Sequence, residues 1–287
     1  MTSKPLPNGP FPALVLLPRR KATVDTSLFL KRAARQAFRL VGLELHAHRR
    51  SKRGDLVLFN RNYLSRYYDS GNSFRSLYNE GMHRTHSEDR DSFEKQCRYY
   101  GLYQMVCKIL GENVAGEIAE CGCWRGHSAY LIASLIAGSK SKRQLHVFDS
   151  FEGGLSDKVK EDQTQLATVD PAAVRREKEA FYSTEEEVSA ALNSFEFVRL
   201  YKGWIPARFN EVSQKTFALV NLDLDLYEPI RDSLEFFFPR LSKGGVIVVD
   251  DYGTTEWPGV KKAVDQFLDA NAVSFYLETI GSMIILK

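Results

Sequence analysis

The sequence predicts an α/β protein with a parallel, doubly wound sheet that ends in an antiparallel hairpin strand and follows a helical N-terminal extension. Short apolar segments alternate with helical segments from Gly116 onward, which is the pattern of strands joined by crossover helices. A glycine-containing turn at residues 120–126 separates the first predicted strand from the first helix. Gly281 divides the last two apolar segments, as expected for a hairpin.

The predicted elements follow one another closely along the chain. The predicted strands span residues 117–121, 144–148, 195–200, 217–222 and 245–249, and a final hairpin pairs residues 273–278 with 283–286. The predicted helices span residues 127–137, 185–192, 228–241 and 259–271. The strands are mainly apolar, which is typical of strands buried on both faces. A charged insertion at residues 152–182 interrupts the alternation.

The N-terminal third differs from the rest of the chain. We expect a flexible basic and Pro-rich tail (1–22), a helical and irregular extension or lid (23–95) and the α/β domain (96–287). Asp25 or Thr26 can cap a helix that runs to about Leu45, and docking of this helix on the protein or on a second subunit is favoured over a membrane surface. Residues 55–95 are polar and aromatic, which indicates an irregular segment facing the substrate, followed by a helix from residue 91 to 110.

Charge and composition exclude several classes of protein. Residues 1–53 carry a net charge of +10, and because the whole chain carries +3, the remainder carries −7. The basic segment favours an anionic surface or substrate, but it lacks the interleaved aromatic residues of a nucleic-acid interface, so no nucleic acid is expected. No apolar run reaches the roughly 20 residues of a membrane span. The four cysteines lack a zinc spacing, so we expect reduced thiols in a cytoplasmic protein, with peripheral contact at the inner membrane surface as an alternative.

The turn after the first predicted strand is the first candidate binding site. Its sequence, ECGCWRGH at residues 120–127, places Glu120 at the strand end and provides Gly122 and Gly126 for close approach of the backbone to a ligand. The spacing differs from the dinucleotide pattern G-x-G-x-x-G, so a pyrophosphate cradle is not indicated. An acidic residue here suits an ammonium group such as that of a methionine moiety, and an ordinary tight turn is the alternative. His127 begins the helix and is interpreted as a polar residue near the cofactor rather than a base.

Asp149 ends the second predicted strand and is followed by Ser150 and Phe151. A carboxylate at this position accepts hydrogen bonds from ribose hydroxyls in nucleotide-binding sheets. NAD-binding proteins place an acid similarly, so Asp149 alone indicates only a nucleoside. Gly203 and Trp204 follow the third strand, where Trp204 borders either the adenine or the acceptor, or belongs to the core.

Four carboxylates follow two neighbouring strands. Asp223 and Asp225 come after the fourth strand, and Asp250 and Asp251 after the fifth. Parallel strands bring these groups to one edge of the sheet, where they would repel one another unless a hard divalent cation bound them. Burial beside an arginine is the alternative, but no Arg or Lys lies within these motifs. A cation can lower the pKa of a bound hydroxyl, and Asp225 is the candidate general base that takes its proton.

These motifs resemble those of the macrocin O-methyltransferase (TylF/MycF-type) family. The resemblance covers about residues 95–287 and is carried by AECGCWRG, VFDSFEG, KGWIP, LDLDLYE, PRLSKGGVIVVDDYG and VKKAVDQF. It implies a class I methyltransferase fold, a Rossmann-like variant, with S-adenosylmethionine as methyl donor and a sugar hydroxyl as acceptor. It also implies that Asp223, Asp250 and Asp251 bind magnesium and that Asp225 is the base. The predicted cofactor-binding residues are Glu120, Cys121, Gly122, Trp124, Gly126, His127, Asp149, Ser150, Phe151, Gly203, Trp204 and Asp223.

The sequence departs from the family pattern in places that concern the acceptor. Leu224 stands between the two aspartates where relatives usually have glycine, and His127 replaces a second glycine of the turn. The expected acceptor is a polysaccharide, lipopolysaccharide or natural-product glycan, and the alternatives are a phenol or catechol acceptor, or a non-catalytic or nucleic-acid-associated protein that keeps the fold. The resemblance favours a homodimer or larger homo-oligomer.

Overall fold

The computed structural model describes residues 43–48, 55–60, 73–152, 155–163 and 179–287. The chain divides into two compact units, and each is described by itself. In the first unit, β1 (Leu43–His48) pairs with β2 (Asp55–Asn60) as an antiparallel two-stranded sheet, with Leu43 opposite Asn60. The remaining described residues belong to the second unit.

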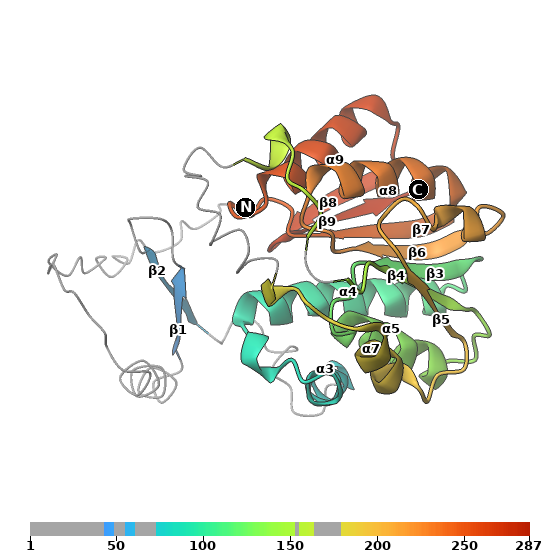
Figure 1. The fold of residues 1–287 in the computed structure, drawn as a ribbon, viewed down its shortest axis with the longest axis horizontal. Helices are drawn as coiled ribbons and strands as arrows, with labels where there is room; N and C mark the ends of the chain where they lie inside the picture. Colours follow the sequence, from blue (N-terminus) through green and yellow to red (C-terminus); the bar gives the residue numbers. More distant parts are fainter. Residues whose placement is uncertain (1–42, 49–54, 61–72, 153–154, 164–178) are drawn as a thin grey trace, which may run out of the picture. The chain divides into compact units, whose positions relative to one another are not determined.

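The second unit is built on a seven-stranded sheet in the order β5-β4-β3-β6-β7-β9-β8 (Figure 1). The strands are β3 (Glu117–Cys121), β4 (Leu145–Asp149), β5 (Val198–Lys202), β6 (Phe217–Leu222), β7 (Leu241–Asp250), β8 (Phe275–Thr279) and β9 (Ser282–Leu286). Strands β3 to β7 are mutually parallel, and β9 lies antiparallel between β7 and β8. The predicted doubly wound sheet with a terminal antiparallel hairpin strand is therefore confirmed.

Helices cover both faces of this sheet (Figure 1). The helices are α3 (Ser73–Arg84), α4 (Phe93–Gly111), α5 (His127–Gly138), α7 (Glu185–Leu192), α8 (Tyr227–Arg240) and α9 (Pro258–Ala270). Three short 3-10 helices span Glu88–Arg90, Lys160–Asp162 and Phe209–Val212. Two apolar clusters form the core, because alternate strand residues point to opposite faces: Ile118 packs with α3, α4, α5 and α7, and Ala119 with α8 and α9. No helix of the described residues is long and apolar enough to span a membrane.

The topology places a binding site at one edge of the sheet. The chain proceeds outward from β3 through β4 to β5, then returns to the other side of β3 and continues through β6 and β7. Loops after β3 and β6 therefore leave neighbouring strands towards opposite sides of the sheet. Crevices at such a switch point, beside the carboxyl ends of the strands, are the usual ligand sites of open α/β sheets.

The described structure bears on three expectations for the N-terminal part. The helix expected to run to about Leu45 does not include residues 43–45, because β1 begins at Leu43; its earlier residues lie outside the described part, as does the tail 1–22. The described residues between 55 and 95 are not irregular throughout, since they contain β2 and α3. In α3, Phe74, Tyr78 and Met82 recur every four residues and form one buried face, which the polar composition conceals. The predicted boundary between residues 95 and 96 falls inside α4.

The remaining strand boundaries shift for local reasons. β5 begins at Val198, three residues later than predicted, because Phe195 and Phe197 pack against the core before the strand starts. β7 begins at Leu241, earlier than predicted.

The insertion at 152–182 lies partly outside the described residues, but its Asp162 carboxylate accepts hydrogen bonds from the backbone N–H groups of Tyr227 (2.7 Å) and Val159 (3.0 Å). This segment therefore satisfies a free N–H at the start of α8.

Candidate active site

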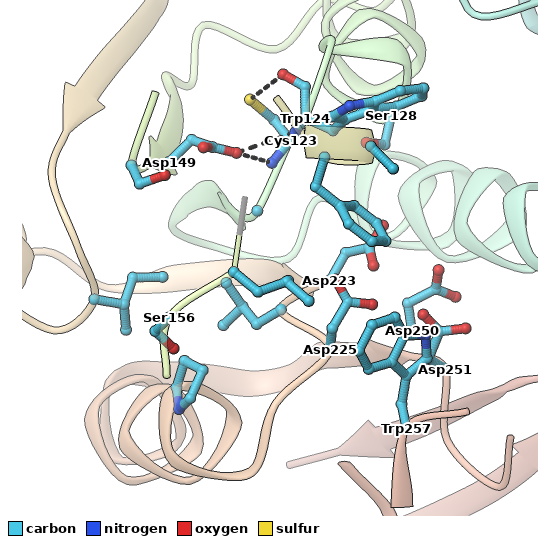
Figure 2. Close-up of a pocket in the computed structure, with 18 of the residues that line it drawn as sticks. Cys123, Trp124, Ser128, Asp149, Ser156, Asp223, Asp225, Asp250, Asp251 and Trp257 are labelled. Atoms are coloured by element: carbon cyan, nitrogen blue, oxygen red, sulfur yellow. Dashed lines mark hydrogen bonds between the residues drawn. The ribbon is translucent and has the colours of Figure 1, made fainter. Parts of the chain in front are cut away.

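A cavity of about 380 Å³ lies at the carboxyl ends of the parallel strands, with further walls from α4 and the described ends of the insertion (Figure 2). Most of the predicted site residues line it: Gly122, Trp124, Asp149, Ser150, Gly203, Trp204, Asp223, Asp225, Asp250 and Asp251. Five predicted cofactor-binding residues do not line it: Glu120, Cys121, Gly126, His127 and Phe151. The predicted site residues therefore form two groups: those that line the cavity and those that are not part of its lining.

The glycine turn after β3 and the loop after β6 lie in direct contact. Gly122 has a φ of +79°, and a Cβ atom there would come within 1.8 Å of the carbonyl oxygen of Asp223. The backbone N–H of Asp223 also donates to the carbonyl of Cys121 at 2.9 Å. Because neither the conformation nor the space admits a side chain, glycine is required at this position.

Asp149 shapes the same turn from the end of β4. Its Oδ2 accepts hydrogen bonds from the backbone N–H groups of Cys123 (2.8 Å) and Trp124 (3.0 Å), and its Oδ1 accepts one from Phe151 (3.1 Å). Figure 2 shows the two contacts to the turn. A carboxylate has about four acceptor positions, so Asp149 retains capacity for a ribose hydroxyl. Phe151 is buried, and its role in the structure is packing.

Glu120 is fully buried below the turn and does not line the cavity. Its Oε1 accepts a hydrogen bond from Nδ2 of Asn221 at 3.0 Å. Burial raises the pKa of Glu120 to about 7, against the lowering effect of hydrogen bonds from Ser128 and Asn221. A cationic group bound next to the turn would favour its charged form.

His127 points away from the cavity into the helical layer. Its Nε2 lies 3.0 Å from the carbonyl oxygen of Tyr78, and its ring contacts the rings of Tyr78 and Tyr99. Burial, reinforced by Lys95, lowers the pKa of His127 to about 3. His127 therefore belongs to the junction of α5 with α3 and α4, and the prediction that it lies at the cofactor cavity is wrong.

This burial predicts an acid-dependent loss of stability. Folded His127 stays neutral, whereas an unfolded histidine is protonated below pH 6.5, so stability falls as pH decreases from 6.5 towards 3 by about 1.4 kcal/mol per pH unit. Urea unfolding of the native protein and of His127→Phe at pH 7, 6 and 5 measures this effect. The free energy of unfolding of the variant should fall less steeply as the pH decreases, because unfolding of the variant takes up about one proton fewer. Equal slopes for the two proteins would show that His127 does not contribute.

The four predicted carboxylates converge at one end of the cavity (Figure 2). Oxygen atoms of Asp223, Asp225 and Asp251 lie within 4.8 Å of one another. Burial, together with the neighbouring carboxylates, raises the pKa of Asp223 and of Asp225 well above the usual value. Burial likewise raises the pKa of Asp250 to about 6, although Arg98 opposes this shift. Such a set of hard oxygen donors suits a divalent cation, which would relieve the repulsion.

An arginine from a distant part of the chain accompanies this cluster. Nη1 of Arg98, on α4, lies 3.0 Å from Oδ2 of Asp250 and forms an ion pair with Asp251. Asp250 also accepts a hydrogen bond from Oγ of Ser282 at 3.0 Å. The inference that no basic side chain balances the aspartates considered only their own motifs, and Arg98 lies about 150 residues earlier in the chain. The alternative of burial beside an arginine, which the motifs alone disfavoured, therefore applies to Asp250 and Asp251 in the structure.

Lys95, Arg98 and Tyr99 line the cavity and were not among the predicted site residues. A signal for them exists in the sequence. Lys95, Tyr99, Leu102 and Val106 fall at the spacing of one helical face, and all four are buried. A lysine on an otherwise apolar helix face is unusual and identifies a buried charge that needs a partner.

Comparison with known proteins decides the family. The model of the Macrocin-O-methyltransferase (TylF) family matches residues 52–286. This chain belongs to that family. Over 216 residues it is 30% identical to the demethyldecarbamoylnovobiocin O-methyltransferase of Streptomyces niveus, covering 67% of this chain and 80% of that protein. Over 161 residues it is 32% identical to the 8-demethyl-8-(2,3-dimethoxy-alpha-L-rhamnosyl)-tetracenomycin-C 4'-O-methyltransferase of Streptomyces olivaceus, covering 54% and 60% of the two chains.

A solved structure agrees with this assignment. The O-methyltransferase NovP is similar with a TM-score of 0.55 and 29% sequence identity, over 67% of this chain and 80% of NovP. The resemblance inferred from the motifs is confirmed, and the TylF-family chain is an O-methyltransferase that uses S-adenosylmethionine. The family match begins at residue 52, well before the domain start at residue 96 that the sequence predicts.

Proposed function

We propose that this TylF-family enzyme methylates a sugar hydroxyl of a glycosylated small molecule or glycan, with a divalent cation, Mg²⁺ by default, held by Asp223, Asp250 and Asp251. Asp225 acts as the general base that takes the proton of the hydroxyl. The observation that supports this proposal is the convergence of four carboxylates at one end of the cavity whose remaining walls suit the methyl donor. The relatives act, by their names, on novobiocin and tetracenomycin precursors, and the latter carries a rhamnosyl group.

The cavity fits S-adenosylmethionine in several respects. Asp149 retains acceptor capacity for a ribose, and the exposed faces of Trp204 and Ile205 offer a wall for an adenine. The indole Nε1 of Trp124 is buried, and no described residue accepts its hydrogen bond, so it is available to a ligand. Bound S-adenosylmethionine supplies an already activated methyl group. The protein therefore has to orient the acceptor and remove its proton rather than provide a nucleophile.

The carboxylates fit a divalent cation, which would lower the pKa of an acceptor hydroxyl and fix its direction. Asp223 and Asp251 belong both to the proposed ligand set and to the group whose oxygens converge within 4.8 Å. Two aspartates are candidates for the third ligand of the cation. The proposal assigns it to Asp250, which the structure shows paired with Arg98, whereas Asp225 lies in the convergent group.

The acceptor end of the cavity has an apolar wall. Leu224, Phe181 and Trp257 line it, and the two aromatic rings meet edge to face with centroids 5.9 Å apart. An apolar wall next to a carboxylate cluster suits a deoxysugar, which has both a hydrophobic face and hydroxyl groups. A homo-oligomer and a membrane contact through the basic N-terminus stay predictions, and the latter concerns residues outside the described part.

Calorimetric titration tests the metal set. We expect wild-type enzyme to bind S-adenosylhomocysteine and, separately, Mg²⁺. Asp250→Asn should weaken Mg²⁺ binding at least tenfold, because a ligand charge is lost, while binding of S-adenosylhomocysteine changes little. Asp225→Asn should keep the Mg²⁺ signal. The reverse pattern would replace Asp250 by Asp225 in the ligand set, and wild-type enzyme without any metal signal would remove the metal from the proposal.

A further inference from the structure

Lys95 is a buried cation in the wall of the cavity without an oxygen partner among the described residues. It stands in the first turn of α4, and its side chain is 8% exposed. Its Nζ has Sδ of Met82 as hydrogen-bond partner, at 3.7 Å. A thioether is a weak acceptor that carries no charge, so this contact does not compensate a buried ammonium group.

The surroundings of Lys95 give its ammonium group no direct ion pair among the described residues. Its Nζ lies 5.2 Å from the ring centre of Tyr99 and 5.8 Å from that of Trp124, and these faces give only weak cation–π attraction. Burial lowers the pKa of Lys95 to about 8; Asp223, Asp91 and Asp250 oppose this shift, and Arg98 adds to it. The group is therefore still mainly protonated at neutral pH. An anion delivered by a ligand would offset the cost of keeping it there.

The other basic side chains that line the cavity already form ion pairs or hydrogen bonds within the protein. Arg98 is paired with Asp250 and Asp251. Arg90 is about half exposed, packs over Trp124 and donates to the carbonyl of Ala180 at 3.4 Å. Within the described lining, Lys95 is thus the buried cation that remains for an incoming anion.

The position of Lys95 indicates which part of the methyl donor reaches it. Figure 2 shows Asp149, the aspartate cluster, and Trp124 with Ser128 on three different sides of the cavity. A ribose at Asp149 and a methyl group directed at Asp225 leave the amino-acid end of the donor beside Trp124. That end carries an ammonium and a carboxylate, and Lys95 adjoins Trp124. The N-terminal end of the 19-residue helix α4, where Lys95 stands, also attracts anions.

We propose that Lys95 binds the α-carboxylate of the methionine moiety of S-adenosylmethionine. The ammonium of Lys95 forms a charge-assisted hydrogen bond with this carboxylate. The negatively charged carboxylate then replaces the uncharged thioether of Met82 as its partner. The inference rests on S-adenosylmethionine being the donor, which family membership establishes, and does not depend on the acceptor or on the metal.

The experiment compares two ligands that differ only in this carboxylate. Titration calorimetry measures the binding of S-adenosylmethionine and of decarboxylated S-adenosylmethionine, both without acceptor, to wild type and to Lys95→Met. We expect Lys95→Met to weaken S-adenosylmethionine at least tenfold and to change the affinity for the decarboxylated ligand less than threefold. Lys95→Arg, which keeps the charge, should retain part of the preference for the carboxylate.

Controls separate this effect from damage to the fold. Lys108, on the same helix but outside the cavity lining, pairs with Glu112 at 2.7 Å, so Lys108→Met should leave both affinities unchanged. If Lys95→Met unfolds, Lys95→Gln and Lys95→Arg serve the same comparison. Equal losses for both ligands, or no loss for either, would overturn the inference alone. A wild-type enzyme that binds neither ligand would overturn the cofactor assignment as well.

Discussion

Asp225→Asn is expected to lower kcat by about 10²- to 10⁴-fold while the affinity for S-adenosylmethionine stays within about threefold of wild type. Asp225 is buried, lines the cavity and has a left-handed backbone conformation (φ +61°) in the loop that follows β6. Burial and the charges of Asp251 and Asp223 raise its pKa, which makes its carboxylate a stronger proton acceptor. Asparagine has the same shape but cannot accept the proton.

The measurement is methyl transfer from labelled S-adenosylmethionine to deoxysugar glycosides selected by screening, with kcat and KM determined separately. Asp269→Asn, at an exposed position of α9, is the matched control and should keep full activity. An active Asp225→Asn enzyme would exclude Asp225 as the base. A rise in KM with unchanged kcat would instead show that Asp225 binds the acceptor without taking its proton.

Arg98→Met is expected to lower the free energy of unfolding by about 3–5 kcal/mol in the presence of a chelator. The substitution keeps much of the side-chain volume but leaves the carboxylates of Asp250 and Asp251 without the guanidinium that pairs with them. Saturating Mg²⁺ should recover part of this loss, because a cation bound by the same carboxylates replaces the missing positive charge.

Urea unfolding of wild type and variant, each with a chelator and with Mg²⁺, measures both effects. Arg231→Met removes a more exposed arginine that pairs with Asp232 at 2.7 Å, and should cost less than about 1 kcal/mol in either condition. If Mg²⁺ stabilises Arg98→Met no more than it stabilises wild type, the cation does not bind where Arg98 now pairs, and the proposed metal set fails.

The parallel sheet and its carboxylate edge could be predicted because both depend on local patterns. β6 was placed without error, since all six of its residues are buried and a polar motif follows at once. Parallel pairing of β6 with β7 then brings Asp223 and Asp250 to one edge by geometry alone. The family motifs add the chemistry of these positions.

The parts that could not be predicted depend on partners far apart in the sequence. His127 follows a ligand-binding turn, yet its hydrogen-bond partner is a carbonyl on α3, a helix that the composition did not suggest. Arg98 and Lys95 acquire their surroundings only when α4 packs beside the strand ends. The spacing of residues on a helix face indicates that a charged side chain is buried. Its partner can be identified only from the tertiary structure.

The contact between Gly122 and the carbonyl of Asp223 has a consequence for the redesign of such enzymes. The turn that approaches the methyl donor and the loop that directs the acceptor move as one piece, because there is no gap between them for independent adjustment. A chimera that takes residues 223–226 from a relative would have to take residues 121–124 with them. The walls formed by Leu155, Phe181 and Trp257 are free of this constraint, and acceptor preference can be changed there without altering the distance between donor and base.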